Sequence, residues 1–234
     1  MPAPIAVHFW PTPNGHKVTI ALEEMGLPYE LKLVNIGKGE QFRPEFLAIS
    51  PNNRMPAIVD PDGPDGAPIS VFESGAILQY LARKTGLFCG RTERERIAVD
   101  QWLFWQMGGV GPMAGQAHHF LRYAPQMEPP QLLPYAQDRY RKEVGRLYGV
   151  LDRQLAKREW AATDEFTIAD MAIYPWAAGW QRQEQTLEDK PHFARWLSAC
   201  AARPAVHRGM AAGAEARTDQ PMSAEEREVL FGRR

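Results

Sequence analysis

The segment from Asn52 to Ile77 constrains the fold of this chain more than any other part of the sequence. It reads as an extended stretch interrupted at Met55-Pro56, a short strand, a turn rich in glycine and proline, a second strand, and a helix that begins near Ser74. The Met55-Pro56 bond is a candidate cis peptide bond, because only X-Pro bonds adopt the cis form at low cost. A helix N-terminus binds anions through its free N–H groups. We therefore expect a strand pair that leads into an anion-binding helix start.

The first part of the chain alternates strands with helices. Strands are expected at 5–10, 29–35, 57–59 and 69–72, and helices at 16–25, 44–49 and 74–84. This alternation predicts a small α/β sheet, which we assign to a domain of residues 1–85.

The pattern changes after Gly86, where residues 86–91 read as a linker. Beyond the linker we find no convincing strand, and residues 92–234 are expected to form an all-helical domain. Helical patterns cover 94–123, 135–158, 168–183, 192–202 and a short stretch at 224–231. Thr167 precedes Asp170 by three positions, which predicts a capping box in which aspartate replaces glutamate.

Composition excludes several classes of protein. The chain has 27 Lys and Arg against 28 Asp and Glu, a formal net charge of -1, so we expect no nucleic acid or acidic membrane surface as partner. No stretch approaches the apolar length of a membrane span, and residues 1–10 lack the pattern of an export signal. The two cysteines, Cys89 and Cys200, cannot form a disulfide framework. These features predict a cytoplasmic protein.

Five motifs together resemble one known family. They are Thr12–Lys17 (TPNGHK), Gly37–Phe46 (GKGEQFRPEF), Ser50–Asp60 (SPNNRMPAIVD), Phe72–Leu81 (FESGAILQYL) and Gln101–Met113 (QWLFWQMGGVGPM). They are similar to motifs of the glutathione transferases, in particular the bacterial nu class, and the similarity runs over most of the chain. The resemblance implies a thioredoxin-like α/β N-terminal domain and an all-α C-terminal domain. It also implies glutathione as co-substrate and a homodimer.

Glutathione has two carboxylates, an amine and a thiol, and each needs a protein partner. We expect Ser74 and the adjacent N–H groups to hold the γ-glutamyl carboxylate, with Glu73 near the amine. The extended segment Arg54-Met55 is expected to pair with the cysteinyl backbone. Taken alone, Glu73-Ser74 reads as a capped helix entrance. Because the same segment also has the candidate cis bond at Met55-Pro56 and follows the first strands and helix, we favour a carboxylate-binding site at Glu73-Ser74 over a simple helix cap.

The turn after the first strand is expected to face the glutathione sulfur. It contains no Cys, which excludes a Cys-x-x-Cys exchange by the protein itself, and no Tyr or Ser. Thr12 offers a hydroxyl donor, and Asn14 an amide and a backbone N–H. Alone, both residues are more often turn formers or caps. By the resemblance they are the catalytic residues at the sulfur.

The resemblance adds further residues and an activity. It implies that Gln41 and Ile58 line the glutathione site, and that Arg139 binds a second glutathione or its carboxylate. It implies reduction of small disulfides by bound glutathione thiolate, together with addition of the thiolate to electrophiles. Two rivals stay open: a non-catalytic protein-binding factor on the same fold, and a dehalogenase or isomerase of one metabolite.

His118 and His119 are adjacent, which is the wrong spacing for two metal ligands on one helix face. We therefore predict no metal site.

Overall fold

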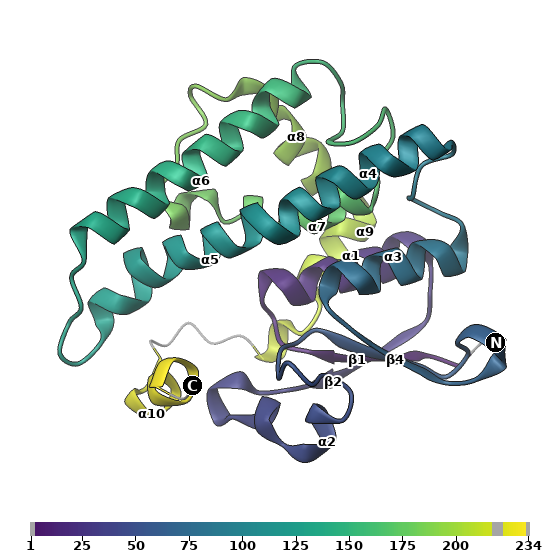
Figure 1. Cartoon of the computed structure of the whole chain (residues 1–234), viewed down its shortest axis with the longest axis horizontal. Helices are drawn as coiled ribbons and strands as arrows, with labels where there is room; N and C mark the ends of the chain where they lie inside the picture. The colour runs from purple at the N-terminus through teal and green to yellow at the C-terminus, as the bar shows by residue number, and fades with distance from the viewer. Residues whose placement is uncertain (1–2, 217–221, 233–234) are drawn as a thin grey trace. The chain divides into compact units, whose positions relative to one another are not determined.

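The computed structural model describes residues 3–216 and 222–232, and its helices and strands are drawn in Figure 1. The chain divides into two compact units. The first comprises residues 1–81 together with 207–234, and the second comprises residues 82–206. Each unit is described separately below. The domain limits 1–85, 86–91 and 92–234 stay a prediction.

The first unit is built on a four-stranded sheet of order β2-β1-β3-β4. β1 pairs parallel with β2 and antiparallel with β3, and β3 pairs antiparallel with β4. The strands are β1 (Ile5–Phe9), β2 (Tyr29–Leu33), β3 (Ala57–Asp60) and β4 (Ile69–Phe72). All four lie where the sequence predicted them, and the thioredoxin-like α/β class of this part is confirmed.

Helices surround this sheet, with α1 and α3 on one face and α2 on the other (Figure 1). They are α1 (Pro13–Met25), η1 (Ile36–Lys38), η2 (Glu40–Phe42), α2 (Pro44–Leu47), η3 (Pro64–Gly66), α3 (Ser74–Thr85), η8 (Ala214–Ala216), α10 (Ala224–Arg227) and η9 (Glu228–Gly232). α9 (Pro204–Ala211) has its last residues in this unit. The predicted short helix at 224–231 corresponds to α10 and η9.

Local sequence explains where α1 begins and ends. Thr12 is its N-cap, Pro13 stands in the first turn, and Gly26 ends the helix in the left-handed conformation with φ of 65°. Gly15 allows the first turn to approach β1, because a Cβ there would lie 2.5 Å from the carbonyl oxygen of Trp10. The start of α1 is therefore fixed against the sheet.

The C-terminal part of this unit is hydrogen-bonded to the middle of α1. The carbonyl oxygen of Gly209 accepts a hydrogen bond of 2.7 Å from the Thr19 hydroxyl and lies 3.1 Å from Nδ1 of His16. The sequence predicted no helix at 204–211, where α9 lies. Pro204 occupies the favoured first helical position there.

The second unit is helical; all of its residues are described and none lies in a strand. Its elements are α4 (Glu93–Trp105), η4 (Gln106–Val110), α5 (Gly111–His118), η5 (His119–Tyr123), η6 (Ala124–Gln126), α6 (Pro134–Leu155), α7 (Ile168–Ala177), η7 (Trp180–Gln183) and α8 (Pro191–Ala201). The all-α prediction is confirmed. The helix predicted at 94–123 contains two π-helical stretches, η4 and η5.

The Asp170 side chain links several segments of this unit by hydrogen bonds. Its buried carboxylate accepts hydrogen bonds from the N–H groups of Thr167 (3.0 Å) and Ala161 (2.9 Å) and from the indole of Trp196 (2.9 Å). The predicted capping box is therefore present, and the same carboxylate also ties α7 to α8 and to the preceding loop.

Candidate functional site

Strand pairing in the first unit brings four loops to one edge of the sheet. Phe9 at the end of β1 pairs with Leu33 at the end of β2. His8 pairs with Ala57 at the start of β3, and Ala57 pairs in turn with Phe72 at the end of β4. The loops that follow β1, β2 and β4 and the loop that precedes β3 therefore meet at this edge. These loops carry seven of the nine residues that the sequence predicted for the site: Thr12, Asn14, Gln41, Arg54, Met55, Glu73 and Ser74.

Thr12 and Asn14 lie at the N-terminus of α1, both half-buried. The Thr12 hydroxyl oxygen accepts a hydrogen bond of 3.3 Å from the N–H of Gly15. A hydroxyl accepts and donates at the same time, so this cap leaves the Thr12 hydrogen able to donate to a ligand atom. The helix N-terminus adds a partial positive charge at the same place. The turn is therefore suited to an anionic sulfur.

The Met55-Pro56 bond is cis, as predicted. Met55 is half-buried and packs against Val34 and Phe46. Arg54 is exposed, and its carbonyl accepts a hydrogen bond of 2.7 Å from the Ser50 hydroxyl.

Gln41 lies in η2, in the loop after β2, and its side chain is 6% exposed. Its Nε2 donates to the carbonyl of Ile36 at 3.2 Å, whereas its Oε1 is buried without a hydrogen-bond partner among the described residues. A buried acceptor without a donor costs about 1–3 kcal/mol. A bound molecule with an N–H or O–H group would remove that cost.

Ile58 does not lie in the loops that contain the other predicted site residues of this unit. Its side chain is fully buried in β3, where the residue pairs with Val7 on one side and Val71 on the other. The whole residue, backbone included, is 0% exposed, so the structure does not place Ile58 at an accessible surface.

Glu73 and Ser74 lie between β4 and α3. Glu73 is exposed and has a φ of 68°, a left-handed conformation that is uncommon for a residue other than glycine and that clusters at functional sites. Its carbonyl accepts the hydrogen bond from the Ile77 N–H at 2.9 Å, so it closes the first turn of α3. Ser74, the first residue of α3, is 4% exposed.

Lys17 contacts Ser74 and is not among the residues that the sequence predicted for the site. Its side chain is 1% exposed, and its Nζ donates to the Ser74 hydroxyl oxygen at 3.5 Å. Burial lowers the pKa of Lys17 to about 7, and the Glu73 carboxylate opposes that shift. A signal was present in the sequence, because Lys17 precedes the apolar Ile20 and Ala21 by three and four positions and so shares their helix face.

Arg139 lies in the second unit, on α6. It is exposed and lines a cavity of about 650 Å³ together with Met113, Tyr135, Tyr140 and charged residues of α6. Arg141 pairs with Glu184, and Arg146 with Glu143, both at 2.7 Å. Among the described residues no ion pair of Arg139 is found. Its charge adds to the hydrogen bond and charge of Arg146 in lowering the pKa of the Glu143 carboxyl.

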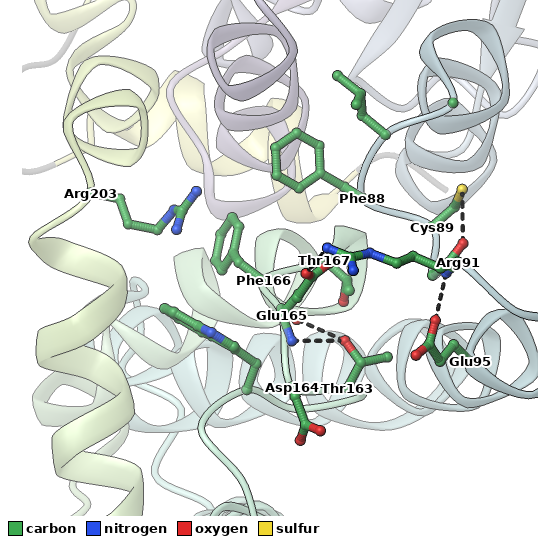
Figure 2. A pocket seen from close by; sticks show the side chains of 14 residues that line it. Phe88, Cys89, Arg91, Glu95, Thr163, Asp164, Glu165, Phe166, Thr167 and Arg203 are labelled. Carbon is green, nitrogen blue, oxygen red and sulfur yellow. Dashed lines mark hydrogen bonds and ion pairs between the residues drawn. The ribbon is translucent and has the colours of Figure 1, made fainter.

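A second cavity of this unit, of about 690 Å³, contains none of the predicted site residues. Figure 2 shows its lining side chains, several of which pair with one another. Arg91 forms an ion pair with Glu165, and the Glu95 carboxylate accepts from the N–H of Arg91 at 2.6 Å. The Arg203 guanidinium stacks 4.1 Å from the Phe166 ring centre. These contacts engage the two arginines of the lining, and we do not place chemistry here.

The His118 ring lies beside Trp176, with ring centres 5.7 Å apart. Burial, together with Arg182 and Arg122, lowers its pKa to about 4. No group of three His, Cys, Asp or Glu side chains that could hold a metal is found in residues 3–216 and 222–232. Within the same ranges, no helix has the length and apolar character that crossing a membrane requires.

Comparison with known proteins agrees with the geometry. Residues 12–84 match the family model of the glutathione S-transferase N-terminal domain, and residues 118–204 match that of the C-terminal domain. The chain is 53% identical over 203 residues to the disulfide-bond oxidoreductase YfcG of Escherichia coli, covering 86% of this chain and 92% of that protein.

Two solved structures extend the comparison. A glutathione transferase from Burkholderia graminis, with two glutathione molecules bound per subunit, is 44% identical with a TM-score of 0.83, covering 90% of this chain and 88% of that one. A glutathione transferase from Pseudomonas putida, with one glutathione disulfide bound per subunit, is 43% identical with a TM-score of 0.81, covering 90% and 92%. Motifs, fold and comparisons agree, and the chain therefore belongs to the glutathione transferase family.

Proposed function

We propose that this protein is a glutathione-dependent disulfide reductase in which the reacting sulfurs all belong to small molecules. The observation that carries the proposal is the meeting of four loops at one sheet edge, where the N-termini of α1 and α3 lie near each other without a cysteine. The naming of YfcG as a disulfide-bond oxidoreductase and the glutathione disulfide in the Pseudomonas putida protein support the same activity.

Glutathione is held along the sheet edge in this proposal. Its γ-glutamyl carboxylate binds Ser74 and the N–H groups at the start of α3, and its amine lies near Glu73. The backbone of Arg54 and Met55 pairs with the cysteinyl unit. The side chain of Gln41 completes the site, and Ile58, which is fully buried, supports it from within β3.

The sulfur lies at the start of α1. There the Thr12 hydroxyl and the Asn14 amide donate to it and stabilise the thiolate over the thiol. Each unit by which the thiol pKa falls corresponds to about 1.4 kcal/mol.

The reaction then proceeds in two exchanges. The bound thiolate attacks one sulfur of a disulfide, a new S–S bond to glutathione forms, and the other half leaves as a thiolate that takes up a proton. A second glutathione thiolate attacks the mixed disulfide, which yields glutathione disulfide and releases the second thiol. Addition of the same bound thiolate to an electrophilic carbon is a second activity of the site.

Arg139 serves the second glutathione. Its guanidinium lines a cavity and is able to bind a carboxylate, and the Burkholderia graminis relative has two glutathione molecules per subunit. We also propose a homodimer in the cytoplasm. Cys89 and Cys200 form no disulfide, which agrees with a reducing compartment, and the homodimer follows from the family resemblance.

The test is turnover of bis(2-hydroxyethyl) disulfide by glutathione, with glutathione reductase and NADPH consuming the glutathione disulfide. We expect NADPH oxidation that depends on this protein and saturates with glutathione. Product analysis separates this reaction from dehalogenation or isomerisation. Absence of turnover together with absence of glutathione binding in calorimetry would overturn the proposal and leave a protein-binding factor on the same fold.

A further inference from the structure

Lys17 is the most buried cation of the described first unit, and nothing in the exchange chemistry requires it. Taking an ammonium out of water costs several kcal/mol unless an anion compensates it. Its Nζ contacts the Ser74 hydroxyl at the start of α3. That helix end carries a partial positive charge of its own, so two positive groups lie together. An anion bound there would be attracted by both.

Resting on the proposed function, we propose that Lys17 is a positioning residue that recognises the γ-glutamyl α-carboxylate of glutathione through Ser74, and that it takes up a proton when that carboxylate binds. Lys17 does not touch the reacting sulfur. It sets the orientation of Ser74 and supplies the charge that makes the site select a ligand with a carboxylate at this end.

The charges around Lys17 support proton uptake. Burial lowers its pKa to about 7, so an ammonium and a neutral amine coexist near neutral pH. The Glu73 carboxylate, at the start of α3, is the charged group that raises the pKa. On α1 itself, the His16 ring is directed at the Gly209 carbonyl and packs edge-on against Phe9.

On α9, Arg208 is already paired with Glu23 at 2.6 Å. A second carboxylate, brought by the ligand, acts in the same direction as Glu73 and raises the pKa of Lys17 further. At a pH equal to the starting pKa, binding then takes up at most half a proton, and uptake nears that limit when the pKa rises by about one unit or more.

The experiment measures proton uptake by calorimetry. S-methylglutathione is titrated into the full-length protein at pH 7 in two buffers of different ionisation enthalpy, because its blocked thiol cannot release a proton. A second ligand, the S-methyl derivative of 4-aminobutanoyl-cysteinyl-glycine, lacks only the α-carboxylate. We expect measurable uptake, up to about half a proton, with the first ligand and almost none with the second.

Two variants complete the test. Lys17→Met keeps the length of the side chain, and we expect it to weaken S-methylglutathione about 10- to 100-fold, abolish proton uptake and leave binding of the decarboxylated ligand unchanged. Lys32→Met is the matched control, because Lys32 is exposed on β2 and paired with Glu30, and we expect it to behave as wild type.

The outcomes separate the inference from the proposed function. If the wild-type protein takes up the same number of protons when it binds either ligand, the proposed role of Lys17 is overturned and the proposed function stands. Equal weakening of both ligands by Lys17→Met would assign the lysine a purely structural role, which also overturns it. Failure of wild type to bind S-methylglutathione at all would overturn both. The wild-type comparison of the two ligands needs no variant, so it decides the matter even if Lys17→Met does not fold.

Discussion

Thr12 has two roles in this structure, and a set of three substitutions separates them. Its hydroxyl oxygen caps α1 by accepting from the Gly15 N–H, and its hydrogen is proposed to bind the glutathione sulfur. Thr12→Val removes the hydroxyl and keeps the shape. Loss of the cap should lower the free energy of unfolding by about 1 kcal/mol. Loss of a hydrogen bond to an anionic sulfur should cost about 1.5–3 kcal/mol in the transition state, which is roughly 10- to 150-fold in kcat/KM.

Thr12→Ser and Thr12→Asp are the matched controls. Serine keeps both the cap and the donor, so we expect stability and kcat/KM close to wild type. Aspartate is a good N-cap, but it has no hydrogen to donate and repels a thiolate. We expect Thr12→Asp to keep its stability and to lose at least as much activity as Thr12→Val.

The assays are urea unfolding for stability and the coupled disulfide reduction for kcat/KM. A Thr12→Val protein that loses about 1 kcal/mol of stability and keeps kcat/KM within twofold of wild type would refute the catalytic role. Thr12 would then be a helix cap only.

Three further predictions concern charged residues. Arg139→Gln should raise the KM for glutathione in the disulfide assay several-fold without changing calorimetric binding of the first S-methylglutathione. Arg153→Gln, whose arginine is exposed on the same helix but does not line the cavity, should change neither. Equal effects of the two substitutions would exclude a specific role for Arg139. Because burial lowers the pKa of Lys17 from 10.5 to about 7, the unfolded chain binds the proton more tightly between these values. The free energy of unfolding without ligand should therefore rise between about pH 7 and pH 10. Relative to Lys17→Met, the rise should be at most ~1.4 kcal/mol per pH unit. If the free energies of the two proteins change with pH in parallel, the burial argument is contradicted. Asp170→Ala leaves three buried N–H donors without their acceptor. Urea unfolding should show a loss of about 3 kcal/mol or more in the free energy of unfolding. A loss below about 1 kcal/mol would show that these donors find other partners.

Much of the fold was predictable because its signals are local. The alternating burial of β1 is contained in its own residues, Thr12 lies directly before the first residue of α1, and Gly26 directly after its last. The capping box at Asp170 was recognised from its three-residue spacing. The sequence did not indicate α9, because a short helix that starts at Pro204 lacks a long apolar repeat.

The site was predictable only in part, because its residues meet through strand pairing. The family motifs pointed to Ser74 and Gln41. That Gln41 Oε1 is buried without a hydrogen-bond partner among the described residues is known only from the structure. Lys17 was missed because lysine usually lies at the surface. Its contact with Ser74 at the start of α3 joins residues that are 57 positions apart in the sequence. The resemblance pointed to Ile58, whereas the structure buries this residue completely.

The central claim is that the redox chemistry takes place on bound glutathione and not on a protein cysteine. The double variant Cys89→Ser, Cys200→Ala tests it most directly, because it removes both cysteines of the chain, one half-buried and one fully buried. The account predicts that kcat/KM for disulfide reduction stays within about twofold of wild type, and that wild type trapped during turnover has no glutathione adduct by mass spectrometry. Loss of activity in a folded double variant, with a glutathione adduct on Cys89 or Cys200 of wild type, would contradict it.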